Sequence, residues 1–208
     1  MLTNDSGAAH FIAKYDAAGN VLWAQKTGGG ADSGTGVVAT DAQGDCYFTG
    51  WFAGTATFGN TNLTSNGLDD LFVARYTSAG DLMWVKQAGG SDYDRVYGIA
   101  VDAERNVYTA GFFVGTATFD SFTPTSNGGF DCFVARLDGP PRLNVNRSGS
   151  QLIVSWPTNQ VGFQLESVTS LSAGGVWSAA TNSPVVVGDQ YVVTNPITGT
   201  SRFFRLRQ

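Results

Sequence analysis

The chain has 208 residues, of which 42% are hydrophobic and 14% are charged, so it has enough apolar sequence for a buried core. Its net charge of −5 argues against nucleic-acid binding, because a protein that binds phosphates needs a basic surface to displace their counterions. The sequence has neither a run of 18 apolar residues nor a basic amphipathic helix, so we expect no membrane span and no membrane-surface helix.

The N-terminal segment is not expected to be a signal peptide. The first eleven residues, MLTNDSGAAHF, have neither the basic nor the apolar region of a signal peptide. Short runs of β-branched and aromatic residues then alternate with turn sequences such as DAAGN (16–20), AQGD (42–45) and TSAGD (77–81). This pattern is typical of antiparallel strands joined by tight turns. Since no stretch shows sustained helical periodicity, we expect an all-β fold.

The chain repeats itself with a period of 61 residues. Aligning residues 11–70 with residues 72–131 gives 24 identities in 60 positions without a gap. The most obvious repeated phrase is GWFAGTATFG, which returns as GFFVGTATFD. Such a repeat indicates stacked copies of one structural unit.

Each copy is expected to contain four strands. In the first full copy these are a, b, c and d, at about 36–41, 45–53, 71–77 and 82–88. A four-stranded sheet cannot bury both of its faces alone, so the copies are expected to stack as propeller blades do. The glycines of the repeated phrase are expected where the backbone approaches a neighbour closely or bulges.

Three phrases carry a family resemblance: FVARYTSAGDLMWVKQAGG, VVATDAQGDCYFTGWFAGTATFG and SNGLDDLFVARY. They resemble the bacterial β-propeller repeat known as the SBBP repeat, over about residues 1–138. The resemblance implies a partial β-propeller and a secreted or cell-surface location, where this family occurs. It supplies no catalytic residues.

The repeat region holds only a little over two blades, whereas propellers commonly close with 4–8. Leu2 and Thr3 align with Leu63 and Thr64, so the chain opens inside a repeat, and the region ends on a c strand. Three explanations stay open. Upstream blades and a signal peptide could belong to a longer protein, copies of the chain could complete one another in a ring, or the blades could form an open stack.

A second domain is expected after the dipeptide Pro140–Pro141, which cannot continue a central strand. The net charge changes from −8 before this linker to +3 after it. Residues 1–139 are assigned to the repeats and residues 142–208 to a small β-sandwich, which resembles fibronectin-type-III or immunoglobulin-like modules. Trp156 and Trp177 are expected in its core. A secretion or sorting module is the alternative.

No catalytic site, metal site or cofactor is predicted, and we expect no enzyme. His10 is the only histidine, and its repeat counterparts are Leu71 and Cys132, which favours a structural role. Cys46 and Cys132 are expected to be buried thiols rather than a disulfide. One histidine and two separated cysteines cannot build a zinc site.

Most acidic residues recur at matching repeat positions, which favours structural roles over an active site. Asp16, Asp41 and Asp102 begin turns, where an aspartate accepts hydrogen bonds from its own backbone. Calcium binding is the alternative, although none of these turns has the alternating ligands of an EF-hand.

A second acidic pattern predicts ion pairs. Asp70 and Asp131 each precede an arginine, Arg75 or Arg136, by five residues. We expect a repeated ion pair between strands or between blades.

One end of the blades is the expected binding site. The a–b and c–d turns are short and nearly uniform, whereas the b–c connections (54–70, 115–131) and d–a connections (28–35, 89–96) are long and differ most between copies. Binding residues concentrate on loops carried by a rigid scaffold, although such loops can also be merely unconstrained. The candidate ligand-binding residues are Asp69, Asp92, Tyr93, Asp94, Arg95 and Phe130.

The sequence therefore predicts a non-enzymatic extracellular or cell-surface module for binding, adhesion or structural support. Its expected partner is a protein or a glycan at the cell surface. The alternative is an accessory, non-catalytic domain of a secreted carbohydrate-active protein.

Overall fold

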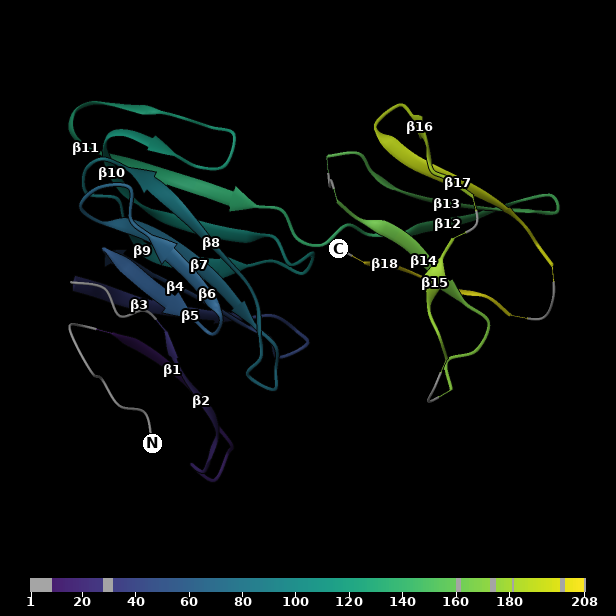
Figure 1. The fold of residues 1–208 in the computed structure, drawn as a ribbon, viewed down its shortest axis with the longest axis horizontal. Coiled ribbons are helices and arrows are strands. Elements are labelled where there is room, and N and C mark those ends of the chain that lie inside the picture. Colours follow the sequence, from purple (N-terminus) through teal and green to yellow (C-terminus); the bar gives the residue numbers. More distant parts are fainter. Residues whose placement is uncertain are drawn as a thin grey trace. The chain divides into compact units, whose positions relative to one another are not determined.

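The computed structural model describes residues 9–27, 32–159, 162–172, 175–180, 182–198 and 201–207. Every regular element in these ranges is a β-strand, and no helix there has the length and apolar composition that a membrane span requires. The chain divides into two compact units, Met1–Gly139 and Pro140–Gln208, which Figure 1 colours from purple to green and from green to yellow. The predictions for the first eight residues and for 28–31 lie outside the described residues.

The described residues of the first unit form eleven strands. They are β1 (His10–Tyr15), β2 (Val21–Thr27), β3 (Asp32–Thr40), β4 (Cys46–Ala53), β5 (Thr55–Phe58), β6 (Thr61–Thr64), β7 (Asp70–Tyr76), β8 (Leu82–Gly90), β9 (Arg95–Val101), β10 (Val107–Thr118) and β11 (Thr125–Leu137). One sheet has the order β1-β2-β5-β6, and the other has the order β11-β10-β8-β7-β4-β3, with β9 paired to β10 (Figure 1). The predicted all-β fold with a partial propeller is confirmed.

Strands β3, β4, β7 and β8 are the predicted strands a to d and form one complete blade, called blade 2. Blade 1 consists of the c and d strands β1 and β2. Blade 3 consists of β9, the first part of β10 and the last part of β11, as strands a to c. The pair Val38–Phe48 in blade 2 returns 61 residues later as the pair Ile99–Thr109 in blade 3. The sequence repeat is therefore also the repeat of the structure.

The b–c connections are largely hairpins, whereas the sequence predicted long loops. The threonine-rich GTATF segment alternates in the way that suits a strand, and in the first copy it forms β5, which pairs with β6. Each hairpin reaches back to the d strand of the preceding blade: Phe58 pairs with Thr27, and Ala117 pairs with Gly90. A β-ladder thus links each blade to the one before it.

Blade 2 is buried on both faces. Successive side chains of a strand point to opposite sides, and each side of blade 2 meets a neighbouring blade. One buried cluster joins it to blade 1 and contains Ile12, Phe48, Phe52, Ala56, Phe58, Phe72, Ala74 and Tyr76. A second cluster joins it to blade 3 and contains Tyr47, Val73 and Val107, with Trp84, Ile99, Val101 and Leu137 packed around them. Stacking of the blades therefore supplies the core of this unit.

The repeated glycine of strand b allows strand a to come close. A Cβ atom on Gly111 would lie 2.0 Å from the carbonyl oxygen of Arg95, and one on Gly50 would lie 2.4 Å from that of Thr35. The strand register shifts at this place in both blades. The close approach and the bulge expected from the sequence are confirmed.

The second unit is a small β-sandwich. Its strands are β12 (Asn144–Ser148), β13 (Gln151–Pro157), β14 (Gln164–Val168), β15 (Ser178–Ala179), β16 (Val185–Val187), β17 (Gln190–Pro196) and β18 (Phe203–Arg207). They form two sheets, β12-β13-β17-β16 and β15-β14-β18. Trp156 is buried in the core with Val154, Leu165 and Val193, as expected. Trp177 instead lies half-buried under the guanidinium of Arg205, at 4.3 Å.

Candidate functional site

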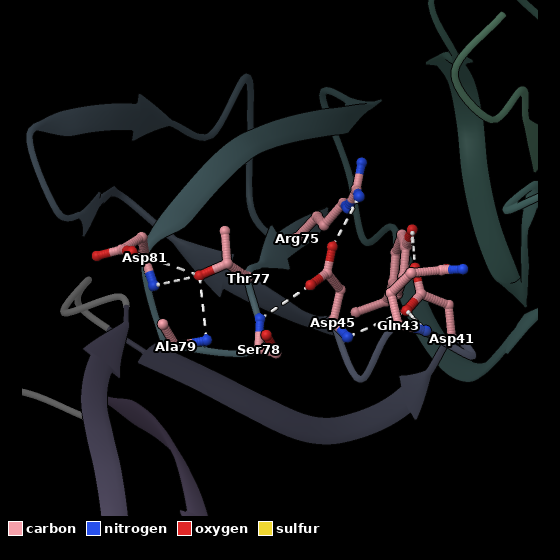
Figure 2. Close-up of polar contacts among 9 residues, drawn as sticks. Asp41, Gln43, Asp45, Arg75, Thr77, Ser78, Ala79 and Asp81 are labelled. Carbon is pink, nitrogen blue, oxygen red and sulfur yellow. Dashed lines mark hydrogen bonds and ion pairs between the residues drawn. The ribbon is translucent and has the colours of Figure 1, made fainter. Parts of the chain in front are cut away.

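The turn end of the blades is fixed by backbone capping. In the a–b turn of blade 2, Asp41 Oδ1 accepts hydrogen bonds from the backbone N–H groups of Gln43 and Asp45, both at 3.0 Å (Figure 2). Asp16 and Asp102 cap their own turns in the same way. The structural role predicted for these three aspartates is confirmed.

Asp45 ties the two turns of blade 2 together. Its carboxylate accepts hydrogen bonds from Arg75 Nη2 at 2.7 Å and from the backbone N–H of Ser78 at 2.8 Å (Figure 2). In blade 3 the counterpart of Asp45 is Asn106, whose side-chain oxygen accepts a hydrogen bond from the N–H of Gly139. The turn end therefore keeps the same construction from copy to copy.

The repeated ion pair between strands or blades that was expected of Asp70 and Arg75, and of Asp131 and Arg136, does not form with these aspartates. Arg75 pairs with Asp45, and Arg136 pairs with Asp138. Five residues along a strand cover about 16 Å and bring the second side chain to the opposite face of the sheet. Within one strand the two side chains therefore cannot meet.

At the opposite end, which we call the connection end, Arg95 is enclosed by the two connections of blade 2. Its Nε donates to Asp69 Oδ2 at 2.7 Å, and its guanidinium stacks 4.1 Å above the Trp51 ring and 5.2 Å from the Tyr93 ring. The backbone of Asp69 is also bonded to both Asp92 and Asp94, which joins the two connections. Arg95 and Asp69 are thus a structural pair, because a buried carboxylate needs such a partner.

Two further carboxylates at this end are fully buried. Asp94 Oδ2 accepts a hydrogen bond from the N–H of Gly90 at 2.6 Å. Burial, together with the neighbouring charges of Asp70 and Asp92, raises the pKa of Asp94 to about 6. Burial also raises the pKa of Asp70, although its carboxylate accepts hydrogen bonds from Gln87 and from Asn66. Neither carboxylate is accessible to a ligand.

An exposed group of rings, called here the aromatic cluster, lies on blade 3 and consists of Tyr97, Phe112 and Phe130. Phe112 meets Phe130 edge-on with ring centroids 4.6 Å apart, and it lies 5.9 Å from Tyr97. Phe130 is 68% exposed. Tyr97 and Phe112 also line a hollow of about 480 Å³. In blade 2 the repeat counterparts of Phe112 and Phe130 are Trp51 and Asp69, and Arg95 covers both of them.

The six predicted site residues thus fall into two groups. Asp69 and Asp94 are buried at the connection end, and the partly exposed Arg95 is paired with Asp69. Tyr93 is 40% exposed and Phe130 is more exposed still, so these two are accessible, and Asp92 lies beside Tyr93 in the same connection. Sequence analysis missed Tyr97, Phe112 and Trp51. The aspartate-to-phenylalanine difference between residues 69 and 130 was the signal that could have led to them.

The histidine and the two cysteines of the chain differ in their surroundings. His10 Nε2 lies 3.1 Å from the carbonyl oxygen of Gly34, and its ring packs edge-on against Phe72. Both cysteines are free thiols. Cys46 is half-buried, but Cys132 is exposed and not buried as expected, because its face of blade 3 is uncovered. Among the described residues there is no group of three or more His, Cys, Asp and Glu placed to hold a metal ion.

Two comparisons agree with this architecture. Residues 84–111 match the SBBP family, which is described as a beta-propeller repeat. Over 110 residues, 50% of this chain, the sequence is 27% identical to an uncharacterized WD repeat-containing protein of Acanthamoeba polyphaga mimivirus, and the match spans 8% of that protein. The fold and these similarities define a protein with propeller-type repeats, a class that forms binding or structural modules.

Proposed function

We propose that this chain is a non-enzymatic binding module that works outside the cell or at its surface and takes a protein or a glycan as its partner. The observation that carries the proposal is the contrast between the two ends of the blades. The turn end keeps the same capped turns in each copy. The connection end replaces the Asp69–Arg95 pair of blade 2 by the exposed ring of Phe130 in blade 3.

The aromatic cluster has the chemistry of a contact surface. Aromatic rings bury a large area with few rotatable bonds, so they cost little conformational entropy on binding. Next to Phe112 in the sheet lies Arg95, with the half-exposed ring of Tyr93 against its guanidinium. A partner would therefore meet apolar rings beside a polar hydroxyl, which suits both a sugar and a protein side chain.

The pairing and burial of the carboxylates at the connection end support binding rather than catalysis. A general acid, a base or a nucleophile has to reach its substrate. Here Asp69 is paired with Arg95, and Asp70 and Asp94 are buried with internal hydrogen bonds. His10 is engaged with the backbone of Gly34.

The proposal also places the protein outside the cell or at the cell surface. It is supported by the resemblance of the repeats to a family of secreted and surface proteins. The second unit, as a fibronectin-III-like or immunoglobulin-like module, would be a natural neighbour in such a protein. Cell fractionation with protease accessibility of the protein in its own organism tests this part.

The binding proposal is tested on the purified chain with a glycan array and with surface-protein fractions, using Tyr93→Ala and Phe130→Ala variants. Each variant is expected to weaken capture at least tenfold, which corresponds to about 1.4 kcal/mol. Phe122→Ala is the matched control, because Phe122 is an exposed ring outside the cluster. Unchanged capture by both variants would exclude this surface. Hydrolysis of a bound glycan would exclude the non-enzymatic role, and capture restricted to polysaccharides would favour the accessory-domain alternative.

A further inference from the structure

The two outermost blades of the first unit leave opposite faces uncovered. On blade 3, Val134 is 78% exposed, whereas its counterpart in blade 2, Val73, is 2% exposed. On blade 1, Phe11 is 67% exposed, whereas its counterpart Phe72 is fully buried. Apolar residues that the repeat normally buries thus lie open at both ends of the stack, and contiguous apolar patches of this kind mark interaction sites.

Contacts within the chain show what covers each face. Between blades 1 and 2, Ile12 of β1 belongs to one buried cluster with Phe72, Ala74 and Tyr76 of β7, and the ring of His10 lies 5.5 Å from that of Phe72. The c strand of one blade therefore packs on the c strand of the next.

The contact between blades 2 and 3 follows the same rule. Val73 of β7 belongs to the buried cluster against which Leu137 of β11 packs. Val73 and Leu137 are the repeat counterparts of Ile12 and Tyr76, which belong to one buried cluster between blades 1 and 2. The blades thus have a front and a back, and the front of each meets the back of the following one.

By the same rule, the uncovered front of blade 3 matches the uncovered back of blade 1. The front of blade 3 carries Cys132 and Val134, the counterparts of His10 and Ile12. The back of blade 1 carries Phe11 and Tyr15, the counterparts of Phe72 and Tyr76, and Tyr15 is 57% exposed whereas Tyr76 is 2% exposed. One chain therefore presents both halves of an interface that it already forms twice internally.

We propose that the front of blade 3 (Cys132, Val134) binds the back of blade 1 (Phe11, Tyr15) of a second copy of this chain, head to tail. Such a heterologous contact generates a ring when its rotation closes and an open stack when it does not. The two copies would place Cys132 of one beside Phe11 of the next, as His10 stands beside Phe72 within the chain. This contact overlaps the ligand surface proposed above, because Cys132 pairs with Phe112 in the sheet and lines one hollow with Tyr97 and Phe112, so a second copy and a ligand would compete for this face.

Light scattering coupled to size-exclusion chromatography over a range of concentrations tests the proposal. The wild-type chain is expected to have at least twice the mass of one chain. Val134→Asp and Phe11→Asp are each expected to weaken association at least tenfold, and because both side chains are exposed, neither change disturbs the fold. Val185→Asp, at an exposed position of the second unit, is the control.

Mixing the two variants separates this arrangement from others. The Phe11→Asp variant keeps an intact blade 3, and the Val134→Asp variant keeps an intact blade 1, so an equimolar mixture is expected to form a dimer that neither forms alone. A symmetric contact of blade 3 with blade 3 would give no such recovery. A monomeric wild-type chain, or association that both variants leave unchanged, would overturn the proposal whatever the result of the ligand-capture experiment.

A cross-link gives a second readout. Phe11→Cys, in a Cys46→Val background, is expected to form an interchain disulfide with Cys132 under mild oxidation. Cys46 has Val107 as its repeat counterpart, so valine suits its place. The same variant with Cys132→Ala should stay uncross-linked, and equal cross-linking of both would contradict the proposed contact.

Discussion

At the scale of single residues, the connection end shows how one position changes its role between copies. Position 69 holds an aspartate whose charge is neutralised by Arg95, whereas the equivalent position 130 holds an exposed phenylalanine. Asp94 is a second such case, because its counterpart in the preceding copy is Ser33, so at this position only the later copy has a buried carboxylate. A buried carboxylate destabilises the folded chain while it is charged.

The pH dependence of stability is expected to report on Asp94. Its folded pKa of about 6 lies above the unfolded value of 3.8, so the folded state binds the proton more tightly. The free energy of unfolding should therefore rise by about 1 kcal/mol through this group as the pH falls from 7 to 5, and this gain is lost again as the pH rises through 6. Urea unfolding of the wild-type chain and of Asp94→Asn at both pH values measures the difference. Carboxylates with lowered pKa values, such as Asp16, act in the opposite direction but are common to both proteins. Identical pH dependence in the two proteins would contradict this role of Asp94.

A glycine substitution tests the crossing of strands a and b. Gly111→Ala would place Cβ within 2.0 Å of the carbonyl oxygen of Arg95, so the backbone has to move. We expect a loss of about 2 kcal/mol or more in the free energy of unfolding, together with disturbance of the Arg95–Asp69 pair. Gly98→Ala is the control, because its Cβ would meet only the Ala110 methyl, at 3.9 Å. Equal effects of the two changes in denaturant unfolding would show that the close approach is not what requires Gly111.

At the scale of elements, the b–c hairpin is the part that joins blades. β5 pairs with β2, and the end of β10 pairs with β8, in the same relative register one repeat later. Phe58, at the end of β5, is fully buried against Phe72 with ring centroids 4.7 Å apart. The hairpin therefore contributes both backbone pairing and an aromatic side chain to the interface between blades 1 and 2.

Removing that side chain should loosen blade 1. Phe58→Ala is expected to lower the free energy of unfolding by about 3–5 kcal/mol, as truncation of a buried phenylalanine usually does. Phe122→Ala, in the corresponding hairpin of the second copy but exposed, should change it by less than about 0.5 kcal/mol. Thermal and urea unfolding measure both. Hydrogen exchange should show the loss of protection first in β1 and β2, and a loss confined to β9 would contradict the assignment.

At the scale of the whole molecule, the chain consists of two units with separate cores. The core of the first unit lies between blades, and that of the second lies around Trp156. Separate cores of this kind usually respond separately to substitution.

Trp156→Ala is expected to unfold or loosen only the second unit, by about 3–5 kcal/mol. Amide hydrogen exchange followed by mass spectrometry should show faster exchange in β13, β14 and β17, while protection in β4 and β7 stays as in the wild type. Faster exchange in both units to the same extent would mean that they fold as one cooperative body.

The sequence by itself determined the features that depend on neighbouring residues and on period. The 61-residue repeat, the strands and the turns capped by Asp16, Asp41 and Asp102 could all be predicted, because strand propensity and turn chemistry act over a few residues. The proposal that the connection end binds a partner also began there, with Tyr93 and Phe130 as its accessible members.

Only the tertiary structure decided which side chains meet. Arg75 pairs with Asp45 from the a–b turn, and Arg95 pairs with Asp69 from another connection. Whether a face is covered is decided in the same way: Val73 is buried and Val134 exposed, although both are valines at the same position of the repeat. The physical reason is that burial and pairing depend on neighbours brought together by the stacking of blades, which the local sequence does not encode.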